Sequence, residues 1–233
     1  MLSFVIPTYN EEKSIGPLLD ALGAQMSEGD EIIIVDSYSK DRTVDVAQSK
    51  GARVVLQQKM GIGAAKTEGA RNAANGLVVM LDADCVPCAD FVQRIKARFK
   101  EKPELVALCG LDLYSSDSGF WRAVYNIYSM KVFWLGKAFH RISGKYWLAA
   151  NNCAIMKDVF FSVGGYRSVV CEDNDLMMRL PANRNVVYDA KIVATLSDRR
   201  FREGGFFRTV FMWIVADARA WLGSGKDAKS YRK

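Results

Sequence analysis

The chain has 233 residues, of which 50% are apolar and 25% are charged, and it carries a net charge of +6 at pH 7. This composition excludes disordered and fibrous proteins and allows one large hydrophobic core. The five cysteines are scattered and odd in number, which favours reduced thiols over a disulfide framework. The start lacks a secretion-signal pattern, and no apolar run reaches the ~20 residues that span a bilayer. We therefore expect a cytoplasmic protein.

Apolar runs that are typical of buried strands alternate with helical patterns through the first half of the chain. The predicted strands are residues 2–7, 31–36, 53–57, 77–81 and 105–110. Between them, apolar residues recur at helical spacing at Ile15, Leu18, Leu19 and Leu22 and again at Phe91, Ile95 and Phe99, and another helix begins near Asp41. This alternation predicts an α/β fold with a mostly parallel sheet covered by helices on both faces.

Three of the predicted strands are followed by polar loops, PTYNEE at 7–12, DSYSKD at 36–41 and DADC at 82–85. In open α/β sheets, ligands bind outside the carboxyl ends of the strands, so these loops form the candidate site. Asp41 has two interpretations that stay open, a contact to a ligand or a simple helix cap.

The D-x-D pair in the third loop indicates a metal site. Asp82 and Asp84 can turn toward one point, where they would repel each other unless a cation lay between them. Mg²⁺ and Mn²⁺ prefer such oxygen ligands and are commonly shared with substrate phosphates. The neighbouring Cys85 and Cys88 could form a zinc half-site or a redox pair, but the chain has one histidine and no second C-x-x-C. We expect these cysteines to be structural.

Two further segments contain candidate site residues. GIGAAKTEGARN at 61–72 has closely spaced glycines but lacks the pattern of a dinucleotide fingerprint or a P-loop. It predicts a helix of small residues, with Arg71 able to reach an anion. In VCEDNDLMMRL at 170–180, Glu172 and Asp173 precede a helical pattern. These acids are explained either by the helix dipole or by a role as general base.

Taken in order, six segments resemble the nucleotide-sugar transferases of glycosyltransferase family two, which have the GT-A fold. They are FVIPTYNEE, EIIIVDSYSKDRT, the glycine segment leading to GARN, VVMLDADC, NNCAIMKDVFFSVGGY and CEDNDLMMRL. The resemblance covers about residues 3–200, and SDRRFREGGFFRT resembles a subset of the family in which paired arginines follow the last strand. It implies one Rossmann-like catalytic domain over 1–233, with a nucleotide-sugar-binding half at 1–115 and an acceptor half at 116–233.

The resemblance also implies roles for individual residues. The nucleoside pocket is expected to be lined by Pro7, Thr8, Tyr9 and Glu11, with Asp36 bound to the base or ribose. Near the phosphates and metal it places Arg71, Asp82 and Asp84, and the base that deprotonates the acceptor is Asp173, with Glu172 as the alternative. If the basic C-terminal segment lies at a membrane surface, Arg199 and Arg200 are placed to hold a phosphate of the acceptor or donor. The sequence departs from the family pattern at Cys85, and at Tyr38 and Lys40 where smaller residues are usual.

The implied function is a metal-dependent, inverting transfer of a sugar from a UDP- or GDP-sugar to a hydroxyl of a glycan or lipid-linked acceptor, with Mn²⁺ or Mg²⁺. One alternative is a sugar-phosphate nucleotidyltransferase. That class of enzyme is expected to have a glycine-rich, basic loop after the first strand, whereas the loop here, PTYNEEKS, is acidic and lacks glycine. The other is a non-catalytic homologue that binds nucleotide or glycan, and the intact D-x-D and Glu-Asp pairs argue against it.

Aromatic and basic residues are mixed in two segments of the second half, 119–139 and 204–222. Such helices suit a membrane interface or pack into the protein's own core. We expect core packing for 119–139 and leave both interpretations open for 204–222. The latter contains a predicted stripe of Phe206, Phe207, Val210, Phe211, Ile214 and Ala218.

The stretch after Ser197 is strongly basic and favours an anionic partner. Charge alone admits nucleic acid, acidic lipid or a phosphorylated substrate. With the resemblance, we expect no nucleic acid, and a peripheral position on the cytoplasmic membrane face is one implied location.

Overall fold

The computed structural model describes residues 1–146, 151–167, 169, 171–182 and 185–221. In this part of the chain eight strands form one sheet: β1 (Ser3–Thr8), β2 (Glu31–Asp36), β3 (Arg53–Leu56), β4 (Leu77–Met80), β5 (Cys85–Pro87), β6 (Ala107–Ser115), β7 (Cys153–Met156) and β8 (Val186–Ser197). The helices are α1 (Ile15–Gly23), α2 (Thr43–Ser49), α3 (Ile62–Asn72), α4 (Phe91–Glu101), α5 (Gly119–Ser143), α6 (Lys157–Ser162), α7 (Glu172–Arg179), α8 (Arg199–Gly204) and α9 (Phe206–Trp221).

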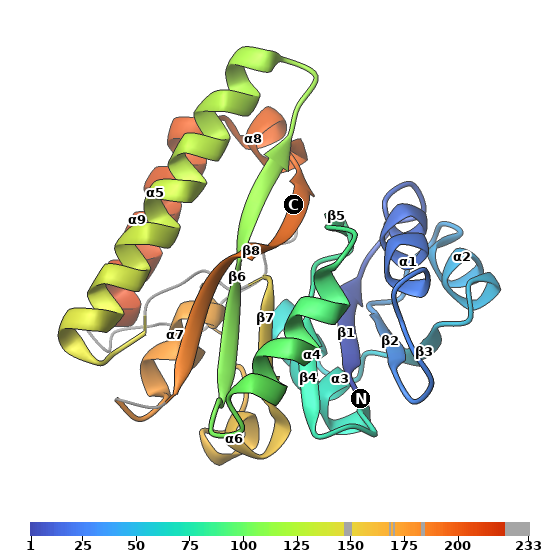
Figure 1. Ribbon diagram of the computed structural model, residues 1–233. Helices are drawn as coiled ribbons and strands as arrows, with labels where there is room; N and C mark the ends of the chain where they lie inside the picture. Colours follow the sequence, from blue (N-terminus) through green and yellow to red (C-terminus); the bar gives the residue numbers. More distant parts are fainter. Residues whose placement is uncertain (147–150, 168, 170, 183–184, 222–233) are drawn as a thin grey trace.

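The sheet has the order β3-β2-β1-β4-β7-β6-β8-β5 and consists of a parallel half and a mixed half. β1, β2, β3 and β4 run parallel, as the alternating pattern predicts, because a helix connects each strand to the next. β7 runs antiparallel to β4 and β6, and β5 runs antiparallel to β8. The predicted α/β fold with a helix-flanked sheet is confirmed (Figure 1). The predicted motif loops all belong to the parallel half.

In the parallel half, β1, β2 and β4 are buried on both faces, whereas the edge strand β3 is partly exposed. Along β1, Phe4 and Ile6 point into the core under α1, and Val5 points into the core under α3. Gly69 allows α3 to lie close to β1, because a Cβ at this position would lie 2.3 Å from Cγ1 of Val5. Burial on both faces explains why these strands are continuous apolar runs in the sequence.

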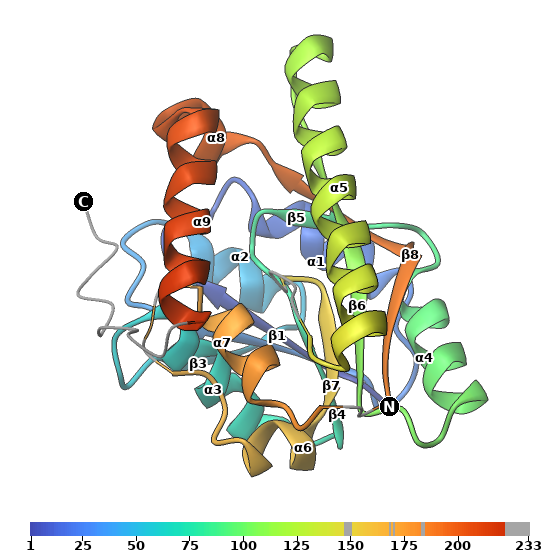
Figure 2. The same cartoon turned by 90° about the vertical axis from the view of Figure 1, so that its left-hand side faces the viewer.

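The mixed half is built on the long parallel pair of β6 and β8, which is interrupted by a bulge between Gly110 and Leu111. α5 packs on β6, and α9 lies beside α5 (Figures 1 and 2). Aromatic rings join the two helices, with 5.4 Å between the centroids of Tyr125 and Phe206 and 6.5 Å between those of Tyr128 and Trp213. Together, α5 and α9 form the flank that faces the viewer in Figure 2.

The expectation that 119–139 packs into the core is correct only for a narrow stripe of α5. Tyr125, Phe133 and Gly136 are buried, whereas most other side chains of this helix are exposed. In α9, Phe206 of the predicted stripe packs on Tyr125 of α5, whereas Phe207, Phe211 and Ile214 are exposed. None of the helices in the described part of the chain is both long and apolar enough to cross a membrane.

The helix predicted near Asp41 is α2, which begins at Thr43. The Asp41 carboxylate accepts hydrogen bonds from the backbone N–H (3.0 Å) and the hydroxyl (2.5 Å) of Thr43. It also accepts one from the N–H of Glu12 (3.2 Å), in the loop after β1. These contacts support a structural role for Asp41, which holds the first residue of α2 and joins two loops, while the cap position itself is Arg42.

Candidate active site

The loops that follow β1 and β2 lie side by side at the carboxyl edge of the sheet. Thr8 and Asp36 end the two strands in register, and the Thr8 hydroxyl donates a hydrogen bond to Oδ1 of Asp36 (3.0 Å). Asp36 is buried, and it also accepts hydrogen bonds from the backbone N–H (2.8 Å) and hydroxyl (2.6 Å) of Ser39. Asp36 therefore fixes the shape of the loop that follows it.

Two exposed tyrosines stand on these loops. Tyr9 follows β1 and is 42% exposed, and Tyr38 follows β2 and is 60% exposed. Tyr38 has a left-handed backbone with a φ of 60°, which is uncommon for a residue other than glycine and is often found at functional sites. Asn10, also left-handed, holds the loops together by accepting a hydrogen bond from the N–H of Lys40 (2.8 Å). Pro7 is half-buried at the end of β1.

An ion pair connects the loop after β1 to the far end of the chain. Glu11 accepts hydrogen bonds from both terminal nitrogens of Arg199, at 3.0 and 2.5 Å. Arg199 is the first residue of α8, and its Nη2 also lies 3.6 Å from Oδ2 of Asp84. Arg200 is exposed on the same helix. The structure thus brings the paired arginines to the edge that carries Glu11 and the D-x-D.

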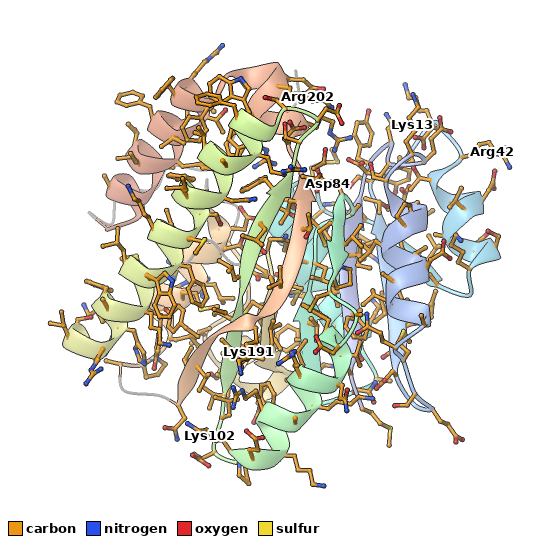
Figure 3. The ribbon with its side chains drawn as sticks, turned by 45° about the horizontal axis from the view of Figure 1, so that its top comes forward. Lys13, Arg42, Asp84, Lys102, Lys191 and Arg202 are labelled. Carbon is orange, nitrogen blue, oxygen red and sulfur yellow. The ribbon has the colours of Figure 1, made fainter. Side chains whose placement is uncertain are left out.

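Asp82 and Asp84 follow β4 and lie close to each other and to this ion pair. The backbone N–H of Asp82 donates to Oδ1 of Asn151 (2.5 Å), which precedes β7. Burial, and then the neighbouring Asp82 carboxylate, raise the pKa of Asp84 to about 6, against the opposing charge of Arg199. In the view of Figure 3, Asp84 lies on the same upper edge as Lys13, which follows the loop after β1, and Arg202 of α8.

The D-x-D fits a divalent cation only in part. Oδ1 of Asp82 is buried and has no hydrogen-bond partner among the described residues, and Asp84 is held near Asp82 despite their repulsion. These are oxygen donors of the kind that Mg²⁺ and Mn²⁺ prefer. However, the described residues contain no group of three or more His, Cys, Asp or Glu placed to hold a metal. Asp82 and Asp84 can therefore hold a cation only if a substrate and water complete its coordination.

The centre of the site contains a lysine that the sequence analysis missed. Lys66 of α3 is 1% exposed, and its Nζ lies 3.2 Å from Oδ1 of Asp173 and 3.6 Å from both Oδ1 of Asp82 and Oε1 of Glu172. Burial alone would lower the pKa of Lys66, but the carboxylates of Asp173, Asp82 and Glu172 outweigh burial and raise this pKa above its ordinary value. Lys66 is therefore a permanent cation that links the D-x-D to the Glu-Asp pair.

The glycines of α3 explain how Lys66 reaches this position. A Cβ at Gly63 would lie 2.9 Å from the carbonyl oxygen of Arg167 and 3.3 Å from Cγ of Glu172. Gly63 therefore allows the first turn of α3 to press against the segment that leads into α7. In the sequence, the signal for this position is a single lysine in a helix whose other buried residues are mostly small: Gly63, Ala65, Gly69 and Ala70.

Glu172 and Asp173 form the first turn of α7, as predicted. Burial, opposed by the charge of Lys66 and assisted by the Glu172 and Asp82 carboxylates, raises the pKa of Asp173 to about 7. A carboxylate with a pKa near neutrality can accept a proton from a substrate and release it again. Cys171, the residue before α7, has a left-handed φ of 57°, which marks a sharp turn into the helix.

Asp112 of β6 is a second charged residue that the sequence analysis did not identify. Its Oδ1 is buried without a hydrogen-bond partner among the described residues. Burial, followed by the charges of Asp82 and Asp173, raises the pKa of Asp112 well above its ordinary value. Asp112 therefore borders the site as a buried carboxyl group whose charged form is disfavoured.

The structure does not bring Arg71 to the site. This residue lies exposed in the last turn of α3, and its carbonyl oxygen is 3.4 Å from Nζ of Lys157 at the amino edge of the sheet. Lys66 is the basic residue of α3 that reaches the carboxylates. Cys85 begins β5 and Cys88 follows it, both as free thiols, and burial raises the pKa of the Cys85 thiol well above its ordinary value.

The fold and the carboxylates at the carboxyl edge of β1, β2 and β4 define an α/β protein of the GT-A class. The chain belongs to glycosyl transferase family 2, whose family model matches residues 3–167. The resemblance seen in the sequence is therefore correct at the level of the family. The subset with paired arginines stays a prediction.

Relatives and solved structures agree with this assignment. An uncharacterized glycosyltransferase of Haemophilus influenzae is 28% identical over 77% of this chain and 62% of its own length. An undecaprenyl-phosphate 4-deoxy-4-formamido-L-arabinose transferase of Pseudomonas aeruginosa is 31% identical over 46% of this chain and 34% of its own length. The chain thus spans less than two thirds of these curated relatives.

The fold is also that of glucosyl-3-phosphoglycerate synthase from Mycobacterium tuberculosis, solved with Mn²⁺, uridine diphosphate and phosphoglyceric acid. The TM-score is 0.71 at 17% identity, over 98% of this chain and 80% of that chain. At this identity the likeness concerns the fold.

Proposed function

We propose that this protein is a metal-dependent, inverting glycosyltransferase that moves a sugar from a nucleotide-sugar donor to an acceptor hydroxyl. The observation that carries the proposal is the cluster in which Lys66 lies within 3.6 Å of Asp82, Glu172 and Asp173. It unites the two acidic motifs at one point. A non-catalytic binding protein would have no need for a buried carboxylate beside the D-x-D.

The donor nucleotide is proposed to bind on the loops after β1 and β2, in the nucleotide-sugar-binding half formed by residues 1–115. Its pocket comprises Pro7, Thr8, Tyr9, Glu11 and Asp36. The exposed ring of Tyr9 is proposed to contact the nucleobase. Asp36 and Glu11 are engaged by Ser39 and Arg199. These two acids therefore act mainly by holding the pocket in shape, and Oδ2 of Asp36, which accepts a hydrogen bond from the N–H of Ser39, is proposed to bind the base or ribose as well.

Mn²⁺ or Mg²⁺ is proposed to bind Asp82 and Asp84 together with the donor diphosphate. When bound, such a cation neutralises the charge of the leaving diphosphate. Glucosyl-3-phosphoglycerate synthase, which shares the fold, was solved with Mn²⁺ and uridine diphosphate, and this supports the proposal. Arg199, 3.6 Å from Asp84, adds positive charge at the same edge.

Asp173 is proposed to be the general base. It takes the proton of the acceptor hydroxyl as the oxygen attacks the anomeric carbon, and the bond from that carbon to the diphosphate breaks on the opposite face. One bond forms and one breaks with inversion, and the proton stays on Asp173. Lys66 positions the base, because its Nζ contacts both carboxylate oxygens of Asp173, at 3.2 and 3.4 Å.

The acceptor is proposed to be a glycan or a lipid-linked sugar that binds on the half formed by residues 116–233. The undecaprenyl-phosphate transferase among the relatives supports a lipid-linked acceptor. Such an acceptor would be reached by a cytoplasmic protein bound at the face of the membrane. Of the paired arginines, Arg199 is committed to Glu11, so Arg200, which is exposed, is the one free to hold a phosphate.

Calorimetric titration with UDP and with GDP, each with and without Mn²⁺, tests this proposal. We expect one nucleotide to bind about tenfold more tightly with the metal, a difference of about 1.4 kcal/mol. Asp84→Ala should remove this gain and leave the protein folded. Asp20→Ala, an exposed carboxylate of α1, should keep it. Equal nucleotide affinity with and without metal would contradict the proposed metal site.

A further inference from the structure

The outward face of α5 is apolar and basic, whereas the outward face of an ordinary surface helix is polar. The 25 residues of α5 include Arg122, Lys131, Lys137 and Arg141 but no aspartate or glutamate. Large apolar residues of this helix are also exposed: Phe120, Trp121, Ile127, Met130, Trp134, Leu135 and Ile142. A helix at a water-exposed surface normally turns its polar residues outward. The outward face of α5 is instead apolar and basic.

The exposed residues are arranged as one continuous surface, which we call the α5 face: Phe120, Ile127, Met130, Lys131, Trp134, Leu135, Lys137, Arg141 and Ile142. At 3.6 residues per turn, these positions form a band along the helix that begins at Lys137, on the flank next to the buried Phe133, and ends at Leu135 on the far side. A shallow hollow on this face is lined by Ile127, Met130, Lys131, Trp134 and Leu135. The helix is about 37 Å long, so the face is an extended surface rather than a local patch.

Cations and aromatic rings are interleaved on the α5 face. Nζ of Lys137 lies 4.8 Å from the centre of the Trp134 ring. Lys131 lines the hollow together with four apolar side chains. Tryptophan is enriched at the level of lipid headgroups, and lysine and arginine stems lie along apolar surface while their charges reach anionic groups. The combination matches the chemistry of a lipid headgroup layer.

We propose that the α5 face binds the surface of an anionic lipid bilayer, with α5 lying in the plane of the headgroups. Apolar burial and attraction of Lys131, Lys137 and Arg141 to acidic lipid act together in such binding. The bilayer itself is a binding partner distinct from donor and acceptor. That the bilayer binds the α5 face does not depend on the proposed function. That the bilayer delivers a lipid-linked acceptor does rest on it.

The position of α5 relative to the site suits this partner. α9 lies beside α5 on the same flank, and α9 contacts α7, whose first turn carries Glu172 and Asp173 (Figure 2). A bilayer on this flank would therefore border the acceptor half. The exposed Phe207, Phe211 and Ile214 of α9 lie on the same flank and can add apolar contact.

The alternative occupant is a second copy of this chain, and charge argues against it. In a symmetric dimer the same face would meet itself, so Lys131, Lys137 and Arg141 of both copies would be brought together without acidic partners on α5. Like charges across an interface are strongly unfavourable. An anionic lipid surface supplies the missing negative charge.

Vesicle sedimentation with the full chain tests the proposal. Wild type is titrated with vesicles of phosphatidylcholine alone and of phosphatidylcholine with about one third phosphatidylglycerol. The test variants are Lys131→Glu/Lys137→Glu, for charge, and Ile127→Ser/Trp134→Ser, for apolar burial. The matched control is Lys100→Glu/Lys102→Glu, which makes the same charge change at the end of α4, away from the α5 face.

We expect wild type and control to bind the anionic vesicles and to be released by high salt. Lys131→Glu/Lys137→Glu should need at least ~30-fold more anionic lipid for half-binding, from the attraction typical of each basic residue. Ile127→Ser/Trp134→Ser should also weaken binding. Binding that is equal for neutral and anionic vesicles, or unchanged in both variants, would overturn the proposal.

Two further measurements separate the outcomes. Sedimentation velocity without lipid reports the oligomeric state, and a wild-type dimer that both variants convert to monomer would assign the face to a second copy instead. Nucleotide titration of Lys131→Glu/Lys137→Glu should match that of wild type. A loss of lipid binding with normal nucleotide affinity therefore supports the bilayer contact whether or not the proposed transfer reaction is correct.

Discussion

The edge of the sheet at β1, β2 and β4 and the flank formed by α5 use the same kinds of residue in opposite ways. At the edge, charged groups are buried, and Lys66 is 1% exposed among three carboxylates. On α5, apolar groups are exposed, and Trp134 is 50% exposed. A buried charge needs a particular partner, so the edge fixes its own geometry. An exposed apolar face needs a covering surface, so the function of the flank depends on another molecule.

The largest effect should come from the base at the edge. We expect Asp173→Asn to slow transfer by about 10²- to 10⁴-fold, because a general base typically contributes that much, and to leave nucleotide affinity unchanged. Because the pKa of Asp173 is raised to about 7, the base is ionised above that pH. The wild-type rate should therefore fall as the pH drops through about 7. Initial rates from about pH 5 to about pH 9 measure both effects.

The corresponding Glu172→Gln variant serves as the control for this assignment. It should retain more activity than Asp173→Asn and keep the fall in rate at low pH. If Glu172→Gln is the slower enzyme, the base is Glu172. Transfer by Asp173→Asn at the wild-type rate would show that neither the contact to Lys66 nor the burial of Asp173 serves catalysis.

The second effect concerns the cation that joins the two acidic motifs. Lys66→Met should lower the free energy of unfolding by about 3–5 kcal/mol, because it leaves three carboxylates near one another without their buried partner. Urea unfolding measures the change. Lys50→Met, which breaks an exposed ion pair with Asp20, should change stability by less than about 1 kcal/mol. A Lys66→Met protein as stable as wild type would mean that the cluster contributes no net stabilisation.

The smallest effect on stability is expected for an exposed residue of α5, and a buried residue of β2 provides the comparison. Ile34 in β2 is fully buried, and Ile34→Ala should lower the free energy of unfolding by about 2–5 kcal/mol. Trp134→Ser on α5 should change it by less than about 0.5 kcal/mol in the absence of lipid, because the ring lies half in solvent. A large loss of stability in Trp134→Ser would mean that α5 is covered in solution and would remove the contrast.

The sequence predicts the first half of the sheet well, and the reason is physical. β1, β2 and β4 are buried on both faces, so each is a continuous apolar run. β8 is harder to predict, because Asp189 and Lys191 interrupt its apolar pattern where the pairing with β6 is irregular. β5 and β7 are three and four residues long, and their antiparallel partners lie far away in the sequence.

The candidate site is predictable where a residue's position on a strand end is enough to place it. Asp36, Asp82 and Asp84 lie at the carboxyl edge because the parallel strands end there. Lys66 could not be found this way, since its burial depends on Asp173, 107 residues later in the chain. Arg71 was predicted to reach an anion, but α3 runs back across the sheet and carries it to the opposite edge.

The ion pair between Glu11 and Arg199 has a consequence for how the protein is made. Its two residues are 188 positions apart, so during synthesis the loop after β1 can pair early with the loop after β2, but the Glu11 carboxylate gains its partner only when α8 has emerged. The buried parallel strands have more local contacts and can form earlier, since contacts between distant parts of a chain close slowly. The loop that is proposed to receive the nucleotide is therefore completed among the last parts of the molecule, and a chain truncated before α8 should have a folded sheet with an unfinished site.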